Sequence, residues 1–88
     1  MKQLVFVVYD AKAEIYEKPF HMQTKGQALR GFTDVANDKE TSIGQHPEDY
    51  TLFEIGEYDN LKGNYEMLPT KKSLGLAIEF LEQPGETD

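Results

Sequence analysis

Histidines and carboxylates are the side chains of this chain that could do acid–base or metal chemistry. The two histidines, His21 and His46, are far apart and lack a partner at ligand spacing. A metal site needs a cluster of histidine and carboxylate ligands. A catalytic carboxylate pair needs surroundings that separate its two pKa values, and most of the 16 acids look solvated. We therefore expect no catalytic residue, no metal site and no enzyme activity.

Cofactor and nucleophile signatures are equally weak. The chain has no cysteine, which excludes a disulfide framework, a thiolate zinc site and a cysteine nucleophile. Gly26 and Gly31 flank a helical turn without the Walker or dinucleotide-binding pattern. We expect no cofactor.

The distribution of charge is more informative. Residues 1–30 carry five cations against three acids, a balance of +2, whereas residues 31–88 balance at −9. Single-strand binders combine cations with aromatic rings, because bases stack on the rings while phosphates meet Lys and Arg. The side chains that could form such a surface are Tyr9, Lys12, Tyr16, Lys18, Lys25 and Arg30. The competing interpretation is that the tyrosines pack in a core and the lysines only solubilise the surface.

The first third of the chain contains the elements that would position these residues. The β-branched and aromatic run 4–9 predicts a central strand that is buried on both faces. Residues 14–17 resume extended structure, and Phe20 and Met22 share one face of this second strand. Pro19 removes a ladder donor, so we expect the second strand at an edge or bulged there.

A helix over residues 25–37 follows. Thr24 and Gln27 form a capping box, in which each side chain bonds the backbone of the other. The apolar stripe behind it consists of Ala28, Phe32, Val35 and Ala36. Asn37 suits a left-handed turn that ends the helix. Residues 39–49 are expected to form a loop.

The second half predicts a hairpin and a short helix. Residues 51–58 form the third strand, and residues 65–68 form the fourth strand, which Pro69 ends. Glu54, Glu57 and Glu66 would share one surface of this hairpin. Ser73 could cap a short helix, one side of which is lined by Leu74, Ala77, Ile78 and Leu81.

These elements predict one α+β domain over residues 1–83, followed by a frayed polar tail at 84–88. Its architecture is a small, mainly antiparallel four-stranded sheet, in the order β-β-α-β-β, with one long helix packed on one face. A length of 88 residues rules out two domains. No apolar run approaches the roughly 20 residues of a membrane span, and the start is too short for a secretory signal. We therefore expect a cytoplasmic protein with no membrane partner.

Most of the chain resembles the small nonstructural protein of gokushovirus-like microviruses, which are tailless phages with single-stranded DNA genomes. The most specific stretch is 46–59, where His-Pro-Glu-Asp leads into an aromatic strand. The other matching stretches are 6–13, 18–20, 26–32, 35–38 and 74–80. The resemblance implies a non-capsid protein that acts in the host bacterial cytoplasm during phage DNA replication. It implies single-stranded DNA binding at the switch to single-strand genome production, and no catalytic residues.

Two functions remain open at this point. In the first, the chain binds single-stranded DNA weakly and without sequence preference. In the second, it is an adaptor or DNA mimic for a phage or host replication protein, because a net charge of −7 opposes simple DNA coating. The acidic side chains that would dock on that partner are Glu54, Glu57, Asp59 and Glu66. The small core also predicts a homo-oligomer, most simply a twofold dimer.

Overall fold

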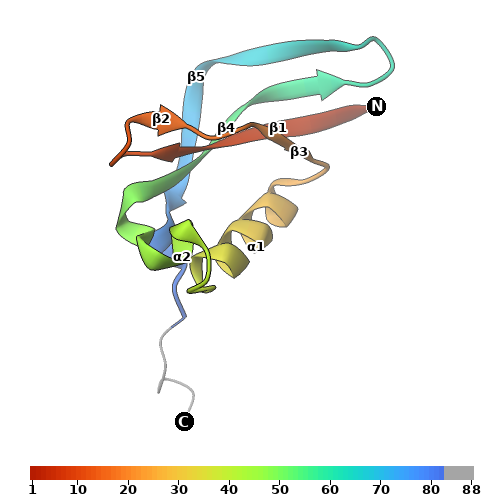
Figure 1. Ribbon diagram of the computed structural model, residues 1–88. Helices are drawn as coiled ribbons and strands as arrows, with labels where there is room; N and C mark the ends of the chain where they lie inside the picture. Colours follow the sequence, from red (N-terminus) through yellow and green to blue (C-terminus); the bar gives the residue numbers. More distant parts are fainter. Residues whose placement is uncertain (83–88) are drawn as a thin grey trace.

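A computed structural model describes residues 1–82 of the chain, and the tail expected at 84–88 lies outside these residues. The described residues form one antiparallel sheet with its helices on one side (Figure 1). The strands are β1 (Lys2–Asp10), β2 (Ile15–Tyr16), β3 (Phe20–Met22), β4 (Tyr50–Asp59) and β5 (Asn64–Leu76). Their order is β2-β1-β4-β5, and β3 also pairs with β1. The predicted α+β class with a mainly antiparallel sheet is confirmed.

Strand β1 is central, as its uninterrupted apolar run predicts. Four consecutive residues, from Val5 to Val8, are buried, so both faces of the strand are covered. The expected second strand is split at Pro19 into β2 and β3, and both pieces pair with β1 at one edge of the sheet. This split is why the sheet has five strands instead of four.

Helix α1 (Lys25–Ala36) covers one face of the sheet, which we call the helix face. The predicted capping box is present: Thr24 Oγ1 accepts from Gln27 N at 3.1 Å, and the Gln27 side chain accepts from Thr24 N at 3.3 Å. Phe32 of α1 belongs to the same core as Phe6 and Leu52 of the helix face, both of which are fully buried.

The end of α1 differs from expectation in its geometry. Asn37 is the C-cap with φ −95°, so it is not left-handed. The side chain of Asn37 ends helix α1 instead. Asn37 Nδ2 donates to the carbonyl oxygens of Thr33 at 2.8 Å and Phe80 at 3.1 Å, and Oδ1 accepts from Glu82 N at 2.8 Å. The helix end is therefore tied to the C-terminal segment.

The loop expected at 39–49 contains two short helices, α2 (Ser42–Gln45) and the 3-10 helix η1 (Pro47–Asp49). The Thr41 side chain caps α2 by accepting from Gly44 N at 2.9 Å. Gly44 is needed there, because a Cβ atom at this position would lie 1.9 Å from the Asp38 carbonyl oxygen. The threonine cap and the close packing of Gly44 make this segment ordered.

The end of the fourth predicted strand is wrong. Strand β5 does not stop at Pro69 but continues to Leu76, and Ser73 pairs with Phe53 inside the sheet instead of capping a helix. Pro69 is tolerated because β5 lies at an edge, where a missing N–H need not break a ladder bond. The expected helix is reduced to the 3-10 helix η2 (Ala77–Phe80), which has no side-chain cap. Ile78, expected on the same side as Ala77, is 45% exposed, whereas Ala77 is buried.

Strand β5 also bends sharply (Figure 1). Its pairing with β4 changes register between Glu54 and Gly56, so that residues 68–71 of β5 have only Ile55 opposite them. Gly56 permits the close approach just beyond the bend, since a Cβ atom there would lie 2.6 Å from the Glu66 carbonyl oxygen. The bend leaves residues 68–71 outside the regular pairing with β4.

Candidate nucleic-acid interface

Among residues 1–82, no helix lies over the sheet face opposite α1, and we call this face the open face (Figure 1). Alternation along β1 places Phe6 and Val8 on the helix face and therefore Val5, Val7 and Tyr9 on the open face. The register then assigns partners to each of these. The side chains on the open face include Val5, Val7, Tyr9, Tyr16, His21, Phe53, Ile55, Tyr58, Tyr65 and Met67, of which Val5 and Val7 are buried beneath their neighbours.

One aromatic cluster lies at the β2 end of the open face. Tyr9 and Tyr16 are cross-strand partners with ring centroids 4.5 Å apart, and Phe53 lies 6.2 Å from Tyr16. Tyr16 remains 44% exposed. Exposed rings held by neighbouring rings are suited to stacking a further planar group.

A second aromatic cluster lies where β3 approaches the β4–β5 hairpin. Tyr58 and Tyr65 are cross-strand partners at 4.7 Å, and His21 lies 5.3 Å from Tyr58. His21 Nε2 and the Tyr65 hydroxyl are 2.9 Å apart, within hydrogen-bond distance. Tyr65 is 51% exposed. This second stacking surface is thus held by a hydrogen bond as well as by ring contacts.

A groove of about 420 Å³ separates the two clusters. Val7 and Ile55 come from the two central strands, while Tyr16 and Pro19 lie on one side and the bent part of β5 on the other. The full lining is Val7, Tyr16, Glu17, Pro19, Ile55, Met67, Leu68 and Lys71. The split at Pro19 and the bend in β5 therefore shape the hollow.

Charge divides between the two faces. Every acidic residue within the five described strands lies on the helix face, as the strand register and the alternation of side chains show. These residues are Asp10, Glu54, Glu57, Asp59 and Glu66. Lys71 belongs to the groove on the open face, where its Nζ lies 5.4 Å from the centre of the Tyr16 ring. The strands thus present aromatic residues and no acid on the open face, and Glu17, between β2 and β3, is the one acid that lines the groove among the described residues.

The six residues expected to contact nucleic acid do not form one surface. Tyr9 and Tyr16 come together on the open face. Lys25 and Arg30 are exposed on α1, which lies on the other side of the sheet. Lys18 lines a groove that includes Val35 and Ile43 of the helical layer. Lys12 is in the turn after β1, beside a hollow that His46 and Asp49 also line.

The sequence interpretation did not assign Phe53, Tyr58, Tyr65, His21 or Lys71 to a nucleic-acid site. Strict alternation from Thr51 predicts that Phe53 and Ile55 share one face of the sheet. In the structure they do share a face. Beyond Ile55 the bulge changes the parity, and in β5 the bend does the same. The aromatic residues of 51–58 are Phe53 and Tyr58, five positions apart, so no alternating pattern in the sequence pointed to both of them.

The acidic hairpin surface of the adaptor hypothesis is also altered. Glu54 is on the same face as Glu57 and Glu66, but it is only 9% exposed and its Oε1 is buried without a hydrogen-bond partner, so it is not accessible to a docking protein. Lys2 Nζ lies 3.7 Å from Glu57 and 3.8 Å from Glu66, which offsets part of their charge. Asp59 Oδ1 accepts a hydrogen bond from the backbone N–H of Leu61 at 2.9 Å. This donor lowers the pKa of the Asp59 carboxyl group.

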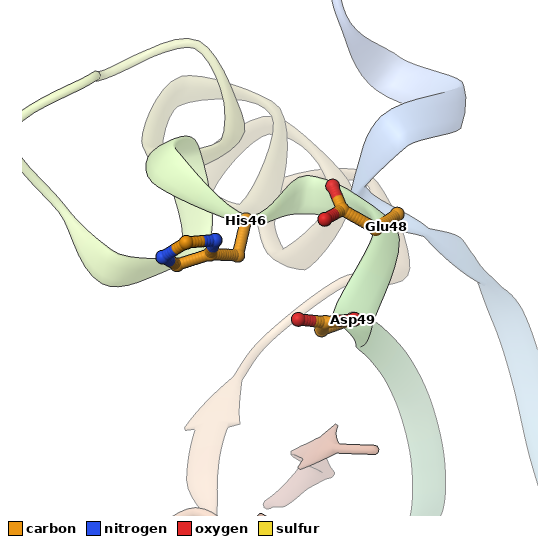
Figure 2. A group of neighbouring side chains, drawn as sticks. All are labelled: His46, Glu48 and Asp49. Carbon is orange, nitrogen blue, oxygen red and sulfur yellow. The ribbon is translucent and has the colours of Figure 1, made fainter. Parts of the chain in front are cut away.

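His46 does have carboxylate neighbours, contrary to the sequence interpretation. Ligand atoms of His46, Glu48 and Asp49 lie within 4.8 Å of one another, around the turn from α2 into η1 (Figure 2). The Asp49 N–H donates to the His46 carbonyl oxygen at 3.0 Å and fixes this turn. His46 and Glu48 are exposed, and exposed groups of this kind are common without an ion. The cluster alone does not identify a metal site.

Tyr50, directly after this cluster, is buried and belongs to the core. Burial raises the pKa of its hydroxyl, and the nearby carboxylate of Asp10 raises it further. The neutral phenol is therefore the form that the fold accommodates.

No helix among the described residues is long and apolar enough to cross a membrane. No curated protein and no solved structure is significantly similar to the chain. Residues 3–80, which include all of the sheet except Lys2 together with α1 and η2, match the family described as Phage ORF5 protein. The chain therefore belongs to this family of bacteriophage proteins.

Proposed function

We propose that this phage protein binds single-stranded DNA on the open face of its sheet, without doing chemistry on it. The observation that carries the proposal is the pair of partly exposed aromatic clusters, Tyr9–Tyr16–Phe53 and His21–Tyr58–Tyr65, on a face whose strands carry no acid. Bases of any sequence can stack on such rings. Binding without sequence preference follows.

The proposed place of action is the replication of a microvirus of the gokushovirus type, in the cytoplasm of the host bacterium. Membership of a phage family and the resemblance carried by residues 46–59 support this role. At the switch to single-strand genome production, newly made strands expose unpaired bases. A protein that stacks bases would keep these strands unpaired.

The net charge of −7 is compatible with the proposal because of where the acids lie. The acids of the strands are on the helix face, and charges separated by more than about 8 Å are largely screened at physiological salt. The sheet itself stands between these acids and a strand bound on the open face. Affinity is nonetheless expected to be lower than that of a basic protein.

A homodimer stays a prediction. Its motive is the apolar side chains left uncovered, including Ile15 at 59% and Met67 at 57% exposure. Light scattering at tens of micromolar protein measures it, and a monomer mass would remove it.

Fluorescence anisotropy with a labelled oligothymidylate, at about 50 mM salt, tests the proposed function. The wild type should bind, and Tyr16→Ala should weaken binding at least fivefold. The matched control is the double change Lys25→Glu with Arg30→Glu on α1, which should leave affinity within twofold. Thermal unfolding checks that each variant folds. Absence of wild-type binding, together with a co-purifying replication protein, would favour the adaptor function instead.

A further inference from the structure

The groove on the open face is a wide, mostly apolar hollow, with Tyr16 and Pro19 on one side and the bent part of β5 on the other. Its volume of about 420 Å³ falls within the roughly 300–1,000 Å³ of small-molecule sites. Val7 and Ile55 are apolar, and Tyr16 offers a ring. A nucleobase is flat and can stack on an aromatic ring, so it suits this lining. A base in a duplex is paired and stacked, so an unpaired base is the one that fits.

Lys71 covers the ring on which such a base would stack. Its Nζ lies 5.4 Å from the centre of the Tyr16 ring, in cation–π geometry. The lysine stem is long and flexible, and the ammonium group can leave the ring for another partner. A base that takes the ring brings its own phosphate to the rim of the groove, where the ammonium group is released.

We propose, resting on the proposed function, that the groove holds one unpaired base against Tyr16 and that Lys71 moves from the ring to the phosphate of the bound strand. Lys71 is the only cation among the described residues that line the groove, and Glu17 is the only acid. Lys25 and Arg30 cannot contribute, because they lie on α1. Stacking, not counterion release, therefore provides most of the affinity.

The dependence of affinity on salt distinguishes these two sources. Each phosphate contact contributes about −0.7 to the slope of log K against log salt for a single strand. One Lys71 contact predicts a slope near −0.7, and an electrostatic coat of five cations predicts roughly −3.5. The slope is measured with oligothymidylate by anisotropy between about 25 and 300 mM salt.

Two variants and one altered oligonucleotide separate the contribution of the Lys71–phosphate contact from that of base stacking. Lys71→Met should lower affinity and bring the salt slope close to zero. Lys72→Met is the matched control, since Lys72 pairs with Glu54 of the helix face, and it should keep the wild-type slope. An abasic oligonucleotide keeps every phosphate and loses the bases, so wild-type affinity for it should fall at least tenfold.

Failure of this inference is separable from failure of the proposed function. Wild-type binding with a slope steeper than about −2, or equal binding of the abasic strand, would overturn the stacking mechanism and leave DNA binding intact. Equal slopes for Lys71→Met and the wild type would remove Lys71 from the phosphate contact. No wild-type binding at about 50 mM salt would end both the function and the inference.

Discussion

The helix face and the open face of the sheet are built by the same strands, yet their side chains are used differently. On the helix face, Phe6 and Leu52 have no exposed surface and pack with Phe32 of α1. On the open face, Tyr16 and Tyr65 keep about half of their surface in solvent. The large side chains of the helix face form the core, whereas Tyr16 and Tyr65 on the open face remain accessible to a ligand.

The same comparison holds for charge. The strand acids share the helix face with the core, where the burial of Glu54 leaves one carboxylate oxygen without a partner. The open face keeps Lys71 beside an aromatic ring. In a sheet, a residue's face depends on odd or even position in the register, so net charge says little about a single face. We expect changes on the helix face to alter stability and changes on the open face to alter binding.

Phe32→Ala should have the largest effect. Phe32 is 4% exposed in the core between α1 and the sheet, and truncation of such a ring costs about 3–5 kcal/mol. That is a large part of the stability of a small domain. Urea unfolding measures the loss. A variant that unfolds with the wild type would show that the helix face is not the core.

Tyr65→Ala should affect binding more than stability. Loss of a stacking ring lowers the free energy of single-strand binding by about 1–3 kcal/mol, whereas unfolding should change by less than about 1 kcal/mol. Anisotropy and urea unfolding on the same sample measure both. Leu61→Ala is the control, because Leu61 is 83% exposed at the hairpin turn and outside the aromatic clusters. A stability loss in Tyr65→Ala equal to that of Phe32→Ala would contradict the distinction between a core on the helix face and a binding surface on the open face.

Glu54→Met should stabilise the protein by about 1–2 kcal/mol, because it replaces a buried, unpartnered carboxylate oxygen by an apolar group of similar length. Urea unfolding at neutral pH measures the gain. The control Glu57→Gln, at a solvent-accessible carboxylate on the same face, should stay within about 0.5 kcal/mol of the wild type. A destabilised Glu54→Met would mean that the carboxylate makes a contact the fold requires.

Alkaline pH should give the smallest effect. Burial raises the pKa of Tyr50, so the folded state holds the phenol proton more tightly than the unfolded chain. The resulting stability is complete below about pH 10 and is lost as pH rises through the folded pKa. The melting temperature of the wild type should therefore fall more steeply above about pH 10 than that of Tyr50→Phe. Parallel profiles for the two proteins would contradict this.

Local signals in the sequence were enough for part of the fold. The run of residues 4–9 predicts β1, and Thr24 with Gln27 predicts the start of α1, because each depends on neighbours along the chain. The course of β5 through Pro69 depends on its being an edge strand, which is a property of the whole sheet. Local patterns could not show it.

The candidate site was predictable only in its first half. Tyr9 and Tyr16 come from adjacent strands near a turn, and the sequence interpretation placed them together. Tyr65 lies before the bend in β5 and Lys71 lies within it, and counting alternate residues fails across the bend. Lys25 and Arg30 were close to the tyrosines in sequence, but α1 carries them to the other side of the sheet.

Both free edges of the described sheet contain a proline, Pro19 between β2 and β3 and Pro69 within β5. Fibrillar aggregation begins when an edge strand of one molecule accepts a strand from another. A proline offers no N–H to that incoming strand, so each edge has a position where the new ladder is interrupted. Copies of this protein made in quantity are thereby protected from joining edge to edge into fibrils.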